Sequence, residues 1–457
     1  MATQVTVARN SQAGALGHED YSLYSSMSED ELIQLAIEQS LTEDPAEQTT
    51  TQKTTTPTHN DPNCHNFYLY PWQSSASCKH CPQLRWETRA RTNTRNMLLI
   101  SRCSKSEPCF IFLSFAGADI NTQASDKASA LFEACKNGHD EIVEFLLSQG
   151  ADANKTNKNG LLPIHVASKR GYYEIVKMLL PVTSRTRTKR SGISPLHLAA
   201  ECNRDDVLEE LVEAGFDVNF TLSPERSRLY EDRRTTVLYF SVFNNNVEAA
   251  QLLLEAGANP NVDLINPLLI SIRHGCMKMM KLLIDYGANI DAYVASHPTT
   301  FPATIMFSMK YLALLKFLMD LGCDAISCFK CQYGCGPHPP IEAKRDRYHD
   351  PQVNKEQSIV QFCEMVSTPE MCRWAGPIID VLLDYVGNVQ LCSRLKEHID
   401  SYEDWANIKY KAEPPRPLAH LCRIKIRSLI GKSRISLIDT LPLPGRLMRY
   451  LQYDYTR

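Results

Sequence analysis

Cysteine and histidine are the residues of this chain whose spacing could support chemistry, and that chemistry would be metal binding. Cys78 and Cys81 have the spacing of half a zinc site, but no second pair follows at the distance that a zinc ribbon or finger requires. A later stretch adds three cysteines and a histidine: Cys328, Cys331, Cys335 and His338. The glycines and prolines among them favour an irregular loop over a zinc knuckle. We therefore expect no metal and no cofactor.

Other kinds of chemistry have even less support in the sequence. No nucleophile is paired with a base and no phosphate-binding loop occurs, so we expect a protein that is not an enzyme. A net charge of −3 favours neither nucleic acid nor an acidic membrane as a partner. No apolar run approaches the roughly eighteen residues of a membrane span, and residues 1–17 lack the apolar core of a signal peptide. Among the 16 cysteines, several lie singly within helical patterns, as reduced core cysteines do, so we expect a soluble intracellular protein.

The C-terminal stretch is the most informative one, because its apolar residues have helical spacing. Four of them fall on one stripe of a short helix: Leu418, Leu421, Cys422 and Ile426. The other side of this helix is basic and carries Arg423, Lys425 and Arg427. Gly431 ends the helix. Such a helix has an apolar stripe that it must bury against something else.

A second apolar set follows and predicts a helical hairpin with a kink. Its members are Ile438, Leu441, Pro442, Leu443, Pro444, Leu447 and Tyr450. The two prolines exclude helix at their own positions, and helical spacing resumes at Leu447. Residues 412–457 hold too little core to stand alone, so we expect them to act as a docking surface. An ordinary amphipathic C-terminal helix would explain the stripe but not the two prolines.

Near the N-terminus, residues 28–44 predict a second short amphipathic helix. Ser28 can cap it, and acidic residues fill its first turn. One face carries Ile33, Ala36, Ile37, Ser40 and Leu41. The small side chains of Ala36 and Ser40 would let a partner approach closely. Residues 1–27 and the Thr-rich, irregular segment 45–115 show no such pattern and are expected to be largely disordered.

From residue 116 to 326 the chain repeats a two-helix unit. The clearest copy is 194–200, where Ser194 caps a helix and Pro195 takes its first position. Weaker copies begin near 129, 162, 236, 266 and 301, and most units end at a glycine that permits a left-handed turn. Gly117 and Gly150 are 33 residues apart, which is the period of the ankyrin repeat. The expected fold class is therefore all-α, an ankyrin-repeat solenoid.

Insertions interrupt this array and suggest a binding edge. One replaces the end of the second repeat with a basic finger that carries Arg185, Arg187, Lys189 and Arg190. A second lies near 224–234, and an irregular one spans 327–357. Insertions in a solenoid fall on one face, which is often the binding face, although solvated loops are an equal alternative. Residues 358–397 are predicted to form a degenerate terminal repeat.

These motifs together resemble the ankyrin-repeat and SOCS-box family. The C-terminal stretch resembles a SOCS box, with an elongin-binding half at Pro417, Leu418, Leu421, Cys422 and Ile426. Its cullin-binding half comprises Ile438, Leu441, Pro442, Leu443, Pro444, Leu447 and Tyr450. Residues 28–44 resemble a ubiquitin-interacting motif that would bind ubiquitin weakly. The resemblance is strongest to the form of the family with that N-terminal motif, although the expected upstream repeats are missing.

The resemblance implies a function that the residues alone do not reach. Members of the family are substrate receptors of a ubiquitin ligase built on elongin B, elongin C and a cullin of the fifth type with its RING subunit. By family analogy the substrates would be filamin-type actin cross-linkers, degraded by the proteasome. The location would be the cytoplasm, with the actin cytoskeleton as a candidate site. The alternative is an ankyrin scaffold outside any ligase, whose C-terminal helices only cap the array.

Overall fold

The computed structural model describes residues 119–338 and 359–454. The chain divides into two units, 1–77 and 78–457, and all the described residues belong to the second. The predicted helix at 28–44 and the segment 45–115 lie outside the described residues. Over the described ranges the chain is helical, and β-structure is limited to two isolated bridges, Gln123 with Ser129 and Thr299 with Val360. No helix in these ranges is long and apolar enough to cross a membrane.

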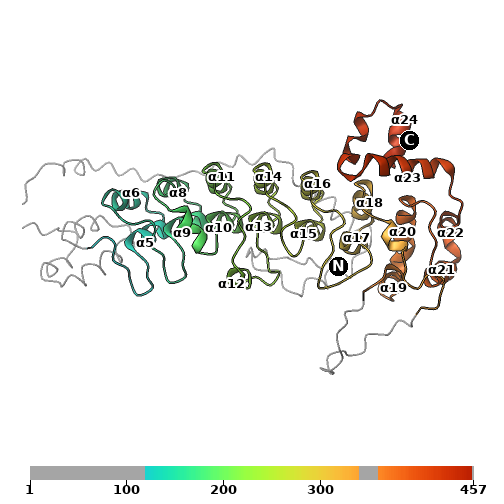
Figure 1. The fold of residues 1–457 in the computed structure, drawn as a ribbon, viewed down its shortest axis with the longest axis horizontal. Coiled ribbons are helices and arrows are strands. Elements are labelled where there is room, and N and C mark those ends of the chain that lie inside the picture. The colour runs from blue at the N-terminus through green and yellow to red at the C-terminus, as the bar shows by residue number, and fades with distance from the viewer. Residues whose placement is uncertain (1–118, 339–358, 455–457) are drawn as a thin grey trace, which may run out of the picture. The chain divides into compact units, whose positions relative to one another are not determined.

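Paired helices stack side by side along residues 130–320, which confirms the predicted solenoid (Figure 1). The first helices of the pairs are α5 (Ala130–Asn137), α7 (Pro163–Arg170), α10 (Pro195–Glu201), α13 (Val237–Phe243), α15 (Pro267–His274) and α17 (Ala303–Ser308). The second helices are α6 (Asp140–Ser148), α8 (Tyr173–Leu179), α11 (Asp205–Glu213), α14 (Val247–Glu255), α16 (Met277–Asp285) and α18 (Leu312–Asp320). Each set forms its own row in Figure 1.

The start of α10 shows why these short segments become helices. Ser194 is the N-cap residue, its Oγ accepts a hydrogen bond from the Leu196 amide at 3.2 Å, and Pro195 follows as predicted. The Nδ1 atom of His197 accepts from the Ser194 amide at 3.3 Å. Its Nε2 atom lies 3.0 Å from the carbonyl oxygen of Thr235 in the following repeat. One imidazole therefore caps a helix and joins two repeats.

A single hydrophobic core runs through the array and into the helices that follow it. Each second helix contributes at least one fully buried leucine to this core, and these include Leu146, Leu179, Leu211, Leu253, Leu283 and Leu318. Burying each such side chain contributes about 1.5–3 kcal/mol. Because each repeat is covered only by its neighbours, the array holds its shape through contacts between adjacent repeats.

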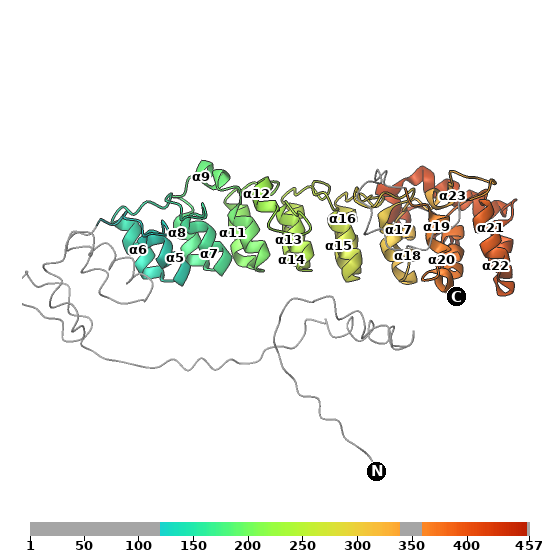
Figure 2. The same cartoon turned by 90° about the horizontal axis from the view of Figure 1, so that it is seen from below.

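The first two insertions, the basic finger and the segment near 224–234, lie at the same edge of the array (Figure 2). The basic finger is not an open loop: it forms the short helix α9 (Arg185–Arg190). The second insertion contains α12 (Pro224–Ser227), and the Ser223 amide donates a 2.9 Å hydrogen bond to the carbonyl oxygen of Gly192 just after α9. The Arg226 guanidinium reaches further, to the carbonyl oxygen of Asn159. The inserted segments therefore form a continuous ridge.

Beyond α18 the chain adds a terminal set of helices and then the C-terminal hairpin. The terminal set comprises η2 (Ile326–Phe329), α19 (Phe362–Val366), α20 (Cys372–Asp384), α21 (Ser393–Asp400), η3 (Glu403–Trp405) and α22 (Ala406–Ala412). The hairpin comprises α23 (Leu418–Ile430), η4 (Lys432–Thr440) and α24 (Gly445–Leu451). Within the segment 358–397, predicted as a degenerate terminal repeat, α20 contains a proline, Pro377.

Candidate functional site

The helix α23 has its hydrophobic residues on the outside. Leu418 is 76% exposed, Leu429 66% and Ile426 40%, and Cys422 is also exposed. These four positions lie on one face, because residues three and four apart neighbour each other on a helix. An amphipathic helix of a free-standing domain turns this face inward. The apolar face of α23 is therefore available to another molecule.

The opposite face of α23 is basic and buried. His420, Arg423 and Arg427 are between 4% and 8% exposed. Arg427 donates to the carbonyl oxygens of Asp320 at 2.5 Å and Met319 at 3.4 Å, both at the C-terminal end of α18. It also donates to the carbonyl oxygen of Leu451 at 2.7 Å, at the end of α24. Burial lowers the pKa of Arg427, and these carbonyl dipoles replace the water that its guanidinium loses.

Basic side chains also contact the carbonyl groups at the C-terminal end of α20. Arg416 donates to the carbonyl oxygen of Leu383 at 3.0 Å. The Nε2 atom of His420 lies 2.7 Å from the carbonyl oxygen of Val386. Burial is the largest influence on both side chains and lowers the pKa of each. Basic groups thus satisfy carbonyl groups at the ends of α18, α20 and α24, where helix dipoles favour positive charge.

Aromatic rings complete the contact between the hairpin and the array. The guanidinium carbon of Arg423 lies 3.8 Å from the ring centroid of Tyr453. That ring packs against Tyr385 with centroids 4.1 Å apart, and the Tyr385 hydroxyl donates to Asp320 at 2.5 Å. Burial raises the pKa of Tyr385, which keeps the phenol protonated as a donor. These contacts fix the orientation of α23 on the array.

The second half of the hairpin divides into buried and exposed residues. Ile438 is 1% exposed and packs with Ile435 and Leu451 in a small separate core. The remaining members of the predicted set fall in two classes: Leu441, Leu443 and Tyr450 are half-buried, while Pro442, Pro444 and Leu447 are exposed. Ile438 therefore holds the hairpin together, and the surface that remains is formed around the two prolines.

The predicted elongin-binding set is also divided by the structure. Leu418, Cys422 and Ile426 lie on the exposed face, whereas Leu421 is half-buried. Lys425 was predicted on the same basic side as Arg423 and Arg427, but it is exposed whereas the two arginines are buried. His420 was not predicted from the sequence to belong to the buried basic face of α23. Its spacing of four residues from Arg416, three from Arg423 and seven from Arg427 is that of one helix face, and this spacing could have revealed it.

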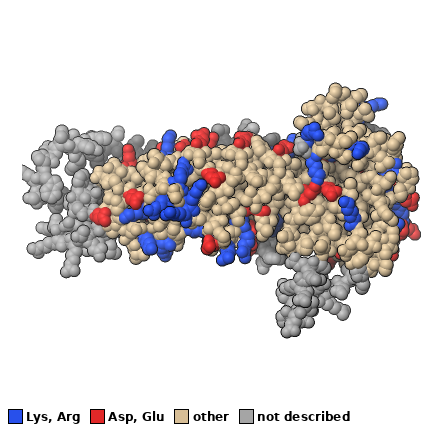
Figure 3. Space-filling model, viewed as in Figure 1, with Lys and Arg blue, Asp and Glu red and all other residues tan. Residues whose placement is uncertain are grey.

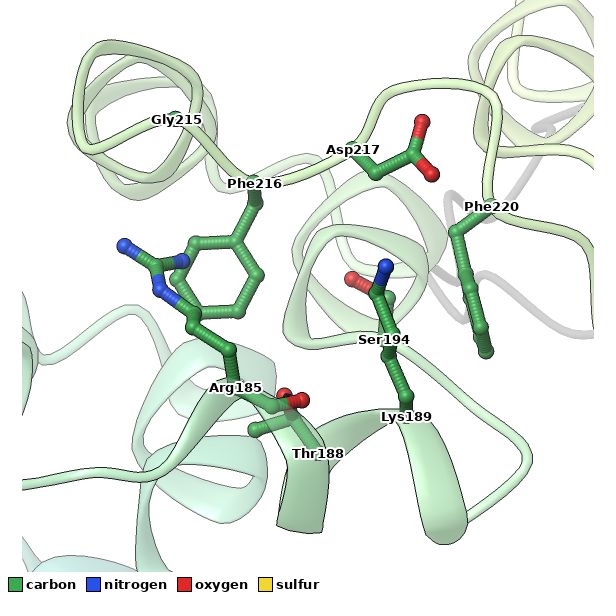
Figure 4. A pocket seen from close by; sticks show the side chains of 8 residues that line it. All are labelled: Arg185, Thr188, Lys189, Ser194, Gly215, Phe216, Asp217 and Phe220. Carbon is green, nitrogen blue, oxygen red and sulfur yellow. Dashed lines mark hydrogen bonds between the residues drawn. The ribbon is translucent and has the colours of Figure 1, made fainter.

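The basic finger contributes both a structural and an exposed part. Arg185 lies 3.6 Å from the Phe216 ring centroid and donates to the carbonyl oxygen of Ala214 at 2.6 Å. Figure 4 shows it along the Phe216 ring at a shallow hollow. The hollow is lined by Arg185, Thr188, Lys189, Ser194, Gly215, Phe216, Asp217 and Phe220. Arg187, Lys189 and Arg190 are exposed, and Figure 3 shows basic side chains gathered over this part of the array.

Other predicted residues are separated or lie outside the described ranges. Cys328 is buried in the array core and Cys335 is exposed. Cys331 and His338 come together, but with Cys363 and Cys392 as neighbours. The candidate ubiquitin-binding residues and the Cys78–Cys81 pair fall in 1–118, which the structure does not describe.

Comparison with known proteins matches both parts of this arrangement. Family models for ankyrin repeats match residues 97–190, 149–222 and 218–294, and the SOCS-box model matches 414–452. The ankyrin match begins at residue 97, whereas the sequence pattern predicts that the array starts at residue 116.

Relatives carry the same pairing of domains. The chain is 72% identical to human Ankyrin repeat and SOCS box protein 2 over 280 residues, which is 61% of this chain and 44% of that protein. It is 38% identical to mouse Ankyrin repeat and SOCS box protein 14 over 279 residues, 60% of this chain and 46% of that protein. The match thus spans less than half the length of each relative. A crystal structure of the human ASB11 ankyrin repeat domain aligns with a TM-score of 0.39 and 25% identity, over 43% of this chain and 87% of that one. The chain belongs to the family of proteins that join ankyrin repeats to a SOCS box.

Proposed function

We propose that this protein is a non-catalytic substrate receptor of a cullin–RING ubiquitin ligase. In this role α23 binds elongin C within the elongin B/C pair, and the segment around Pro442 and Pro444 binds a cullin of the fifth type with its RING subunit. The observation that carries the proposal is the exposed apolar face of α23, within the stretch that the SOCS-box model matches.

The exposed face fits a helix-in-groove mode of binding. Leu418, Cys422 and Ile426 would enter an apolar groove, with Leu429 extending the contact by a further turn. Burying a leucine contributes about 1.5–3 kcal/mol, and a central anchor often costs more than that when truncated. Because the basic face is already occupied by carbonyl groups of the array, the helix can dock without first detaching.

The array would supply the substrate-binding half of the receptor. A ligase of this type accelerates ubiquitin transfer by holding a substrate lysine near the charged conjugating enzyme, which raises its effective concentration. That requires a fixed distance between the two binding surfaces. The contacts of Arg427 and Tyr453 with α18 and α20 support such a fixed connection.

The ridge formed by α9 and α12 is the surface that we assign to the substrate. Arg187, Lys189 and Arg190 expose positive charge there, which favours an acidic region on the target. Family resemblance is the basis on which we propose filamin-type actin cross-linkers as the targets and the cytoplasm, at the actin cytoskeleton, as the location. The predicted helix at 28–44 would add weak binding of ubiquitin.

The deciding experiment is recovery of elongins with the tagged full chain from cells. The double variant Leu418→Ala, Cys422→Ala should lose elongin B, elongin C and cullin together. Leu229→Ala is the matched control, because Leu229 is 74% exposed on the array, as Leu418 is on α23. The control should recover elongins at the wild-type level. Recovery of no elongin by the wild type would favour the alternative, an ankyrin scaffold whose C-terminal helices only cap the array.

A further inference from the structure

A compact group of three cysteines and one histidine lies beside the terminal repeat. The ligand atoms of Cys331, His338, Cys363 and Cys392 all lie within 4.8 Å of one another. The Cys331 sulfur is 3.1 Å from the His338 Nε2 atom and 3.8 Å from the Cys363 sulfur, and the latter is 3.7 Å from the same nitrogen. Residues far apart in the sequence therefore direct four metal-binding atoms to one point.

Two of these distances, 3.8 Å between the Cys331 and Cys363 sulfurs and 3.7 Å from the Cys363 sulfur to His338 Nε2, match the edges of a tetrahedron around zinc, while the 3.1 Å distance is shorter. Zn–S bonds of about 2.3 Å and Zn–N bonds of about 2.0–2.1 Å place two sulfurs about 3.8 Å apart, and a sulfur and a nitrogen about 3.6 Å apart. A disulfide needs sulfurs at about 2.05 Å, so the Cys331–Cys363 pair is too far apart to be one. Three thiolates and an imidazole are a common donor set for a structural zinc ion.

The four side chains come from segments that the fold holds rigidly. Cys363 lies in the first turn of α19 and is 2% exposed, and Cys392 is the N-cap residue of α21 and is 3% exposed. Cys331 lies two residues after the end of η2, and the amide of the next residue, Gln332, donates to the Gln361 side chain at 2.8 Å. The group therefore sits on packed helices and not only on a loop.

The histidine has the second partner that zinc-binding imidazoles usually have. Its Nδ1 atom lies 3.0 Å from the Ser393 hydroxyl oxygen. That hydroxyl donates to the carbonyl oxygen of Gly336 at 2.7 Å, so it accepts the Nδ1–H proton of His338. This arrangement leaves the lone pair of Nε2 facing the three sulfurs. Outer hydrogen bonds of this kind fix the tautomer of metal-binding histidines.

Two nearby cysteines, Cys328 and Cys335, are not part of this group of four ligands. Cys328 lies three positions before Cys331 yet is buried among the apolar residues of the core, and Cys335 is exposed and accepts a hydrogen bond from Gln390 at 3.3 Å. The local spacing that resembles a zinc knuckle is therefore not the set that the fold assembles. Half of the assembled set comes from the terminal repeat, and this is why sequence spacing predicted no metal.

We propose that Cys331, His338, Cys363 and Cys392 form a structural zinc site. All four positions of the tetrahedron are filled by protein atoms, so the ion has no open position for a substrate or water. The site joins the segment after α18 to α19 and α21, and His338 directly precedes residue 339, where the described chain is interrupted. Zinc would thus fasten the terminal repeat, on which the C-terminal hairpin rests, to the last regular repeat.

The test is the zinc content of the purified full chain, co-expressed with elongins B and C and measured by mass spectrometry of the metal. The wild type should hold about one zinc ion per chain after dialysis. Cys363→Ser and Cys392→Ser should each lose most of it. The control Cys335→Ser, which changes the neighbouring exposed cysteine, should keep it. Less than about a tenth of an equivalent in the wild type, or full zinc in both Cys363→Ser and Cys392→Ser, would overturn the proposal.

A second measurement covers the case in which the serine variants do not fold. Metal is removed from the wild type with a chelator under reducing conditions, and cobalt(II) is then added. Cobalt(II) occupies zinc sites, and its absorption spectrum depends on the ligands that surround it. Three thiolates in a tetrahedral site should give strong sulfur-to-cobalt charge-transfer bands together with visible ligand-field bands, and one added equivalent of zinc should remove both. Bands of octahedral cobalt alone would exclude this ligand set.

Discussion

Arg427 of α23 donates a 2.5 Å hydrogen bond to the carbonyl oxygen of Asp320, the last residue of α18. The two residues belong to different parts of the protein, the C-terminal hairpin and the regular array. The same guanidinium also reaches Leu451 at the end of α24. One side chain therefore connects α23 to the ends of two other helices, α18 and α24, and the direction in which α23 presents its apolar face depends on it.

Replacing Arg427 should loosen the hairpin from the array. Arg427→Met keeps most of the buried volume but leaves the Asp320 and Leu451 carbonyl groups without this donor, and hydrogen bonds to charged groups contribute about 1.5–3 kcal/mol. We expect faster hydrogen exchange in 418–430 and a loss of stability of about that size. Lys425→Met is the control, because Lys425 lies on the exposed side of the same helix. Equal effects of the two variants would contradict the role assigned to Arg427.

The two prolines after η4 allow the two halves of the hairpin to be separated experimentally. Pro442 and Pro444 are exposed, so replacing both with alanine should leave the small core around Ile438 intact. We expect the variant to recover elongins at the wild-type level and to lose most of the cullin. Normal recovery of cullin would show that the proline segment is not its binding surface.

Much of the array could be predicted from sequence because its signals are local. Ser194, Pro195 and the terminal glycines act within one turn, and their capping and left-handed geometry appear as expected. The apolar stripe of α23 was predicted for a similar reason, since Leu418, Cys422 and Ile426 are four residues apart.

The features that sequence reasoning missed depend on contacts between distant segments. Burial of Arg423 and Arg427 requires the carbonyl ends of α18 and α24, and a basic side chain gives no local sign that such partners exist. Likewise, Cys331 lies in the loop after η2 and Cys363 lies in α19, 32 residues later in the sequence, so no short motif joins them. Pairings at long range become visible only when the stacked repeats are in place.

Gly376 of α20 should tolerate no larger side chain. A Cβ atom at this position would lie 2.6 Å from the indole ring of Trp405, closer than real contacts allow. Gly376→Ala should therefore displace Trp405 and destabilise the terminal repeat by about 1–3 kcal/mol, measured by thermal unfolding. Gly445→Ala is the control, because a Cβ atom there meets nothing within 4 Å. A variant at Gly376 as stable as the control would mean that Trp405 can move freely.

The buried histidines should make the array sensitive to mild acid. Burial lowers the pKa of His165 and of His197 to about 4, from an ordinary value of 6.5, because the neutral imidazoles are held between repeats. Between these two pH values the unfolded chain binds more protons than the folded one, so stability should fall as the pH falls from about 6.5 to 4. A shift of this size corresponds to about 3 kcal/mol for each histidine.

Urea unfolding of the wild type and of His197→Gln at pH 7.5 and pH 5 would check this expectation. The variant should be less stable at pH 7.5, because it loses the hydrogen bond to Thr235, yet it should lose less stability than the wild type on acidification. His297→Gln, at an exposed position, should keep the wild-type pH dependence. Identical losses in the wild type and His197→Gln would show that protonation of His197 does not limit the stability of the array in acid.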